Sequence, residues 1–185
     1  QKENTLQLIL GFFNLGDFSG KEISITSTGY KIDGGTEVPY TGAYTFTGSA
    51  NHCSITVSGG NTAITLANVR INGGKNFDWG DYCIKVASGS LNLTLAGDNT
   101  IQTEPHISGS SMPIWVTENA TLTIRGNGTL NATNHSDGKA CIGAAWNYRC
   151  GTINIAGGII NATGGGNGGC VIGYSGDRGG GTVNV

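Results

Sequence analysis

Short apolar segments recur along the chain at a nearly constant spacing of about 30 residues. In one series, Ile, Leu or Val alternates with Thr or Asn, and the last residues of successive segments lie 29, 29, 31 and 30 positions apart. The members are Ile64–Leu66, Leu93–Leu95, Leu122–Ile124, Ile153–Ile155 and Val183–Val185. Alternation with a period of two is typical of a β-strand with one buried face. We therefore predict a short strand at each position.

A second series of strands has the same period. Its first residues lie 29, 30, 28 and 30 positions apart, in segments that begin at Ile55, Ile84, Ile114, Ile142 and Ile172. A third, shorter strand is predicted at residues 129–131 and 159–161. A fixed period of this length predicts a solenoid whose core forms between stacked repeats. We expect an all-β, right-handed parallel β-helix over residues 21–185, with three strands per rung and about six rungs.

Residues 1–20 do not fit the repeat. They contain an apolar stretch at the end of a solenoid whose terminal rung would otherwise expose its core. One interpretation is a cap, because the ends of solenoids must be covered. The other is a strand segment that is donated to a neighbouring subunit and so builds fibres.

Composition supports this fold class and excludes several functions. The 185 residues include 33 Gly, but only 10 Lys and Arg and 12 Asp and Glu, with a net charge of -2. So much glycine disfavours long helices. The charge balance argues against nucleic-acid binding, and no apolar run is long enough for membrane insertion.

The cysteines are spaced as structural residues of a secreted protein. They lack the paired spacing of zinc sites, and we expect no metal or other cofactor. Cys53 and Cys83 precede equivalent strands one rung apart, as do Cys141 and Cys170, so each pair is a candidate disulfide. Both pairs are offset by one residue in register, which could place the side chains on opposite faces. Cys150 is left to pair with Cys141, to cross-link subunits or to remain reduced.

Several strand and corner segments resemble repetitive β-helix surface proteins of bacteria and some protists, a family similar to carbohydrate-binding domains. The resemblance covers residues 23–185, and its most specific part is the segment from Leu95 to Ile101, with Gly97, Asn99 and Thr100 at fixed positions. It implies a β-helix at the cell surface more firmly than it implies an activity. The numerous cysteines and glycosylation motifs depart from the bacterial members.

The chain contains six Asn-x-Ser/Thr motifs, about twice the number expected by chance from its composition. They lie at Asn92, Asn119, Asn127, Asn131, Asn134 and Asn161. We predict N-glycosylation of outward-facing turns, best at Asn119, Asn127, Asn131 and Asn134. The alternative is that Asn and Thr simply populate strand exteriors.

The residues provide little support for catalysis. A polysaccharide lyase is the natural enzyme for a β-helix, but it needs a base, a cation and often calcium. The carboxylates neither recur on successive rungs nor form a catalytic pair. We therefore expect no enzymatic activity and no catalytic residues.

Aromatic residues give the best indication of ligand binding. One loop carries Phe77, Asp78, Trp79 and Tyr82, another carries Trp146 and Tyr148, and Tyr174 lies near the equivalent position one rung later. Aromatic faces beside polar groups can bind sugar rings, although packing over the corners of the coil explains them equally well. Trp115 should point outward, between the inward-facing Ile114 and Val116, unless a loop covers it.

We therefore predict a non-enzymatic protein, extracellular or at the cell surface, that serves in adhesion and binds glycans. The alternative is a structural subunit that assembles end to end with copies of itself into a glycosylated filament.

Overall fold

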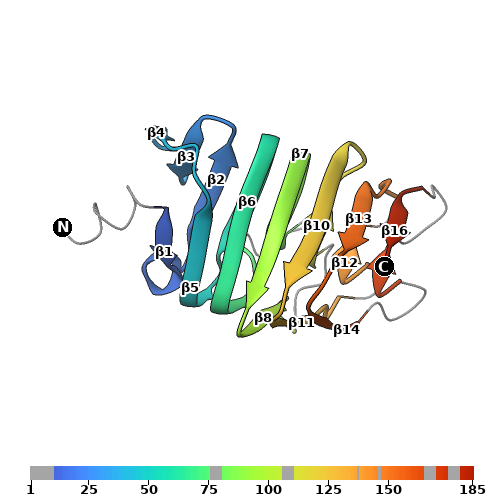
Figure 1. Cartoon of the computed structure of the whole chain (residues 1–185). Helices are drawn as coiled ribbons and strands as arrows, with labels where there is room; N and C mark the ends of the chain where they lie inside the picture. The colour runs from blue at the N-terminus through green and yellow to red at the C-terminus, as the bar shows by residue number, and fades with distance from the viewer. Residues whose placement is uncertain are drawn as a thin grey trace.

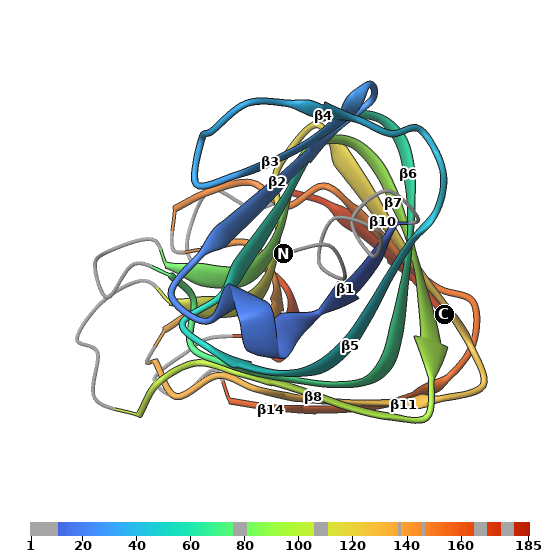
Figure 2. The same cartoon turned by 90° about the vertical axis from the view of Figure 1, so that its left-hand side faces the viewer.

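The predicted strands all form, and they stack in parallel into a β-solenoid of about five turns with about 30 residues per turn. The computed structural model describes residues 11–75, 81–105, 111–136, 138–145, 147–164, 170–174 and 180–185. Figure 1 shows the coils side by side along a rod, and Figure 2 shows them superimposed around a common core. No helix in the described part of the chain is long and apolar enough to cross a membrane.

Each coil contributes to three parallel sheets, and the longest strands bend from one sheet into the next. Sheet 1 contains β2 (Glu22–Thr26), the start of β6 (Ser54–Asn72), the start of β7 (Tyr82–Ala96), β9 (Met112–Val116), β12 (Ile142–Gly143) and β15 (Ile172–Gly173). Sheet 2 contains β1 (Phe12–Asn14), the start of β5 (Tyr44–Asn51), the middle of β6, the end of β7, β10 (Ala120–Gly126), β13 (Thr152–Ile155) and β16 (Thr182–Asn184). Sheet 3 contains the ends of β5 and β6, β8 (Asp98–Gln102), β11 (Thr129–Thr133) and β14 (Ile159–Thr163).

Stacked aliphatic side chains fill the inside of the coil. In sheet 1, isoleucines pair with one another across successive coils, at positions 23, 55, 84, 114, 142 and 172. The first five of these are fully buried. Because successive coils place an isoleucine at the same position in the strand, the core repeats with the spacing between strands, about 4.8 Å.

Asn99 holds the corner between sheets 2 and 3. Its side chain is fully buried, and its Oδ1 accepts a hydrogen bond of 2.9 Å from the backbone N–H of Val69, one coil earlier. Its Nδ2 donates to the carbonyl oxygens of Ala96 in its own coil and Thr129 in the next. Gly97 completes the turn with a φ of 66°, and a side chain there would collide with Asn68. One amide thus links three coils, which explains the most specific segment of the sequence.

Residues 11–20 fold back over the first coil. β1 pairs in parallel with β5, and the 3-10 turn η1 (Leu15–Phe18) follows it. The Phe13 ring stacks on Phe46, with ring centroids 4.9 Å apart, and meets Tyr30 edge-on. These aromatic side chains are buried at that end of the core, and Figure 2 shows β1 in front of the coils that follow. Residues 1–10 lie outside the described part of the chain.

The first coil contains a hairpin that the repeat pattern did not predict. After β2, the chain forms β3 (Gly29–Ile32), antiparallel to β2, and then β4 (Val38–Pro39), antiparallel to β3. These strands lengthen the first coil. The solenoid has about five turns, where we predicted about six rungs.

Replacing Phe13 should open the capped end of the core. We expect Phe13→Ala to lower the free energy of unfolding by about 3–5 kcal/mol, because it removes a buried ring. The matched control is Phe12→Ala, since Phe12 is 53% exposed on the same strand and should change stability by less than about 0.5 kcal/mol. Urea unfolding monitored by circular dichroism measures both. Equal effects of the two substitutions would contradict the capping role.

Asn99 should be far more sensitive than an exposed asparagine at the next corner. Asn99→Ala leaves the Val69 N–H and two carbonyl groups buried without their partner, so we expect a loss of roughly 2–4 kcal/mol. Asn127→Ala, in the exposed turn one coil later, serves as the control and should be nearly neutral. The measurement is again the midpoint and slope of urea unfolding. A neutral Asn99→Ala would show that this corner does not depend on the amide.

Candidate functional site

The structure describes three of the seven residues that we predicted to bind carbohydrate. Tyr82 begins β7, Tyr148 lies in the loop between β12 and β13, and Tyr174 follows β15. Tyr82 is half-buried, whereas Tyr148 and Tyr174 are 58% and 39% exposed. The other four lie outside the described residues: Phe77, Asp78, Trp79 and Trp146.

Trp115 joins the two predicted aromatic groups into one strip. It points away from the core of the coil, as predicted, while Ile114 and Val116 point inward. Its ring centroid lies 6.2 Å from that of Tyr82 and 5.5 Å from that of Tyr148, and both contacts are edge-to-face. Neighbouring side chains cover Trp115, so it is only 9% exposed. We call Tyr82, Trp115 and Tyr148 the aromatic strip; it crosses three successive coils.

Lys85 occupies one face of this strip. In sheet 1 it pairs with Trp115 of the next coil, and its ammonium nitrogen lies 4.0 Å from the centroid of the Trp115 ring and 5.3 Å from that of Tyr82. This is a cation–π arrangement, which stabilises a partly desolvated ammonium. Burial lowers the pKa of Lys85 below its usual value. A ligand could stack on this face of Trp115 only by displacing Lys85.

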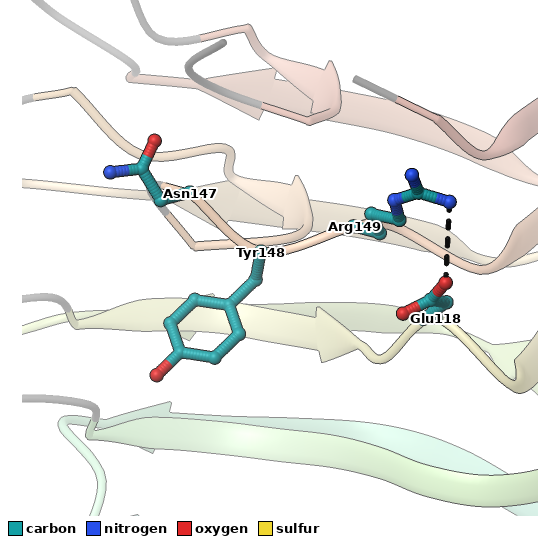
Figure 3. A pocket seen from close by; sticks show the side chains of 4 residues that line it. All are labelled: Glu118, Asn147, Tyr148 and Arg149. Atoms are coloured by element: carbon teal, nitrogen blue, oxygen red, sulfur yellow. Dashed lines mark ion pairs between the residues drawn. The ribbon is translucent and has the colours of Figure 1, made fainter. Parts of the chain in front are cut away.

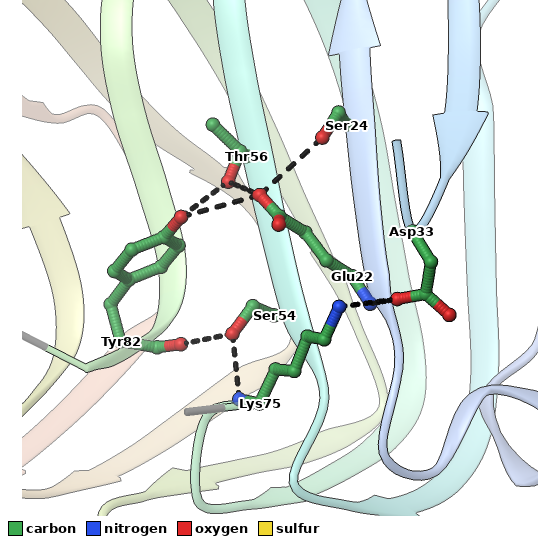
Figure 4. A network of polar contacts seen from close by, with 7 residues as sticks. All are labelled: Glu22, Ser24, Asp33, Ser54, Thr56, Lys75 and Tyr82. Carbon is green, nitrogen blue, oxygen red and sulfur yellow. Dashed lines mark hydrogen bonds and ion pairs between the residues drawn. The ribbon is translucent and has the colours of Figure 1, made fainter. Parts of the chain in front are cut away.

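A network of hydrogen bonds fixes the Tyr82 ring (Figure 4). The hydroxyl groups of Tyr82 and Thr56 are 2.8 Å apart, and they lie within hydrogen-bonding distance of the Glu22 carboxylate, at 3.4 Å and 2.9 Å. Ser24 also lies within hydrogen-bonding distance of Glu22. Burial raises the pKa of Tyr82, so the phenol stays protonated at neutral pH. These contacts fix the orientation of the Tyr82 ring, and the half-buried ring offers little exposed surface on which a ligand could stack.

The same network anchors Lys75, the last described residue before Phe77 and Trp79. The ammonium of Lys75 lies 2.6 Å from the Asp33 carboxylate, and the backbone N–H of Lys75 donates to Ser54 (Figure 4). The hydrogen bond from Lys75 holds the pKa of Asp33 below its ordinary value. The hydroxyl of Ser54 in turn donates to the Tyr82 carbonyl.

A polar pocket lies at the exposed end of the strip, where sheet 1 turns into sheet 2. Its volume is about 390 Å³, and it is lined by Glu118, Asn147, Tyr148 and Arg149 (Figure 3). Arg149 and Glu118 form an ion pair of 3.5 Å between adjacent coils, and each side chain remains more than half exposed. We call these four residues the Tyr148 pocket. It combines an aromatic ring, a hydrogen-bond acceptor and a cationic donor.

Backbone contacts hold the loop that forms this pocket. The N–H of Tyr148 donates to the Ala145 carbonyl, and Asn147 between them adopts a left-handed φ of 62°. Thr117 forms an isolated bridge with Cys150, and its hydroxyl contacts the carbonyls of Val86 and Ala87 in the preceding coil. The corner is therefore tied to three coils, and the pocket residues occupy defined positions.

Sequence reasoning found Tyr148 but missed Glu118, Asn147 and Arg149. The repeat pattern identifies Glu118 and Arg149 as corner residues of successive coils, because they follow equivalent strands. Their equivalent positions in the repeat were the one feature of the sequence that could have indicated a contact between Glu118 and Arg149. Their 3.5 Å contact depends on how each corner bends, and spacing alone does not give this.

The glycosylation motifs occupy three kinds of position. Asn119 and Asn127 lie in exposed turns. Asn92, Asn131 and Asn161 lie within strands, where Asn92 donates to Asn61 and Asn161 donates to Asn131 in adjacent coils. Asn134 is only 4% exposed, and its amide donates to the carbonyls of Lys139 and Ala140. Asn134 is thus buried within its own loop, unlike the exposed Asn119 and Asn127.

None of the five cysteines forms a disulfide in the structure. Cys141 packs in the core, whereas Cys170 is exposed, so these two side chains lie in different environments. Cys53, Cys83 and Cys150 are buried as well. Burial raises the pKa of Cys53 to about 12 and the pKa values of Cys141 and Cys150 to about 11, and it raises that of Cys83 strongly. These buried thiols serve as core side chains.

Among the described residues, no group of three or more His, Cys, Asp or Glu side chains is arranged to hold a metal ion. Comparison with protein families, with curated proteins and with solved structures finds no match to this chain. The site is therefore interpreted from its own geometry.

Thiol labelling distinguishes this arrangement from the disulfides that the sequence suggested. Near pH 8 we expect one thiol per chain, Cys170, to react rapidly with a chromogenic disulfide reagent, and the four buried ones to react only on unfolding. Cys170→Ser should abolish the fast phase. Fewer than five reactive thiols in denaturant without reductant would show that disulfides form after all.

Proposed function

We propose that this protein is a non-catalytic, carbohydrate-binding β-solenoid of the cell surface that serves in adhesion. The proposal includes membership in the repetitive β-helix surface family that the sequence resembles. The observation that carries it is the Tyr148 pocket, whose lining combines an exposed aromatic ring with an exposed ion pair.

The pocket has the features of a site for a small polar ligand. Its volume is near the lower end of the range of about 300–1,000 Å³ found for small-molecule sites, which suits one or two sugar units. The Tyr148 ring offers a flat apolar surface, and its edge contact with Trp115 restricts its movement. A preorganised ring loses little conformational entropy on binding.

Two exposed glycosylation motifs support an extracellular location. Asn119 and Asn127 are exposed in turns and remain candidate glycosylation sites. Asn119 directly follows the pocket residue Glu118, so a glycan there would lie at the rim of the Tyr148 pocket.

Assembly into a filament is the second candidate function. It would use residues 1–20 as a segment donated to a neighbouring subunit. Within one chain, however, β1 already pairs with β5, and Phe13 fills the end of its own core. This use of residues 11–20 favours the carbohydrate-binding proposal.

Removing the Tyr148 ring tests the proposal directly. On a glycan array, we expect the unmodified protein to bind a defined set of glycans and Tyr148→Ala to lose at least tenfold in affinity, as removal of a stacking surface predicts. Phe12→Ala removes an equally exposed aromatic side chain at the other end of the rod and should bind normally. Equal binding by Tyr148→Ala and the unmodified protein would contradict the proposed site.

A further inference from the structure

The Tyr148 pocket presents opposite charges to the same small volume. Glu118 and Arg149 are 56% and 59% exposed, so both retain hydrogen-bonding capacity that their mutual contact does not use. A carboxylate only accepts hydrogen bonds, and a guanidinium only donates them. The two groups lie 3.5 Å apart at their nearest atoms. A ligand that uses both must therefore offer a donor and an acceptor on neighbouring atoms.

We infer that the Tyr148 pocket recognises a neutral saccharide through two adjacent hydroxyl groups, one donating to Glu118 and the other accepting from Arg149. This inference rests on the proposed function and names its ligand class. A hydroxyl group both donates and accepts, so a vicinal diol can meet both requirements at once. The Tyr148 ring would then contact the apolar face of the same sugar.

Electrostatics disfavours charged sugars at this site. A carboxylated or sulfated sugar would gain from Arg149 but would be repelled by Glu118 at a similar distance. An amino sugar with a free ammonium group would be attracted by Glu118 but repelled by Arg149. The ammonium of Lys85 lies over the rings of Trp115 and Tyr82, and Lys85 does not line the pocket. The net charge of the lining residues is therefore zero.

Calorimetric titration of the full chain tests the inference. The probes are neutral gluco-, manno- and galacto-oligosaccharides, their single-deoxy derivatives and an oligogalacturonide. We expect a neutral probe to bind more tightly than the oligogalacturonide. Deletion of one hydroxyl of the recognised pair should lower affinity about tenfold or more, as loss of a charge-assisted hydrogen bond does.

Matched variants assign the effect to the ion pair. Glu118→Gln and Arg149→Gln should each weaken binding of the neutral probe about tenfold, and Glu118→Gln should improve binding of the oligogalacturonide. Asp98→Asn and Arg125→Gln remove the same charges from exposed positions elsewhere and should leave both affinities unchanged. Tighter binding of the oligogalacturonide by the unmodified protein would overturn the inference.

The outcomes separate this inference from the proposed function. Binding that is lost in Tyr148→Ala but insensitive to both Glu118→Gln and Arg149→Gln overturns the diol inference and leaves carbohydrate binding standing. If none of these saccharides binds, both the function and the inference are overturned.

Discussion

Register between successive coils is the constraint on which the rest of the structure depends. A parallel strand pairs with its neighbours above and below, so one residue of slippage would exchange buried and exposed side chains. The isoleucine column in sheet 1 and the amide of Asn99 at the corner between sheets 2 and 3 both hold this register. The column does so through packing, and Asn99 does so by satisfying buried backbone groups of three coils.

The same register produces the candidate site. Thr56, Lys85, Trp115 and Gly143 pair in sequence along the outside of sheet 1, so the ammonium of one coil lies against the indole of the next. At the following corner, Glu118 and Arg149 belong to adjacent coils and meet only because those coils are stacked. The pocket is thus a property of the assembled solenoid and of no single repeat.

Periodicity predicted the parts of the structure that repeat and missed the parts that do not. The strands that we predicted from alternation with a period of two form in all three sheets, and Trp115 points outward as predicted. The β3–β4 hairpin was not predicted because it occurs only once and does not repeat with the period. Asn134 was expected in an exposed turn, yet its amide binds the backbone of its own loop, a local preference of asparagine that a motif search does not weigh. Glu118 and Arg149 were missed because their contact depends on corner geometry.

The central claim is that stacked corners build a saccharide pocket around Tyr148. The most direct test is a crystal structure of the protein soaked with the neutral oligosaccharide that binds best. The account predicts a sugar ring against Tyr148, with adjacent hydroxyls on Glu118 and Arg149 from neighbouring coils. A sugar bound elsewhere on the rod, or corners in which Glu118 and Arg149 lie far apart, would contradict it.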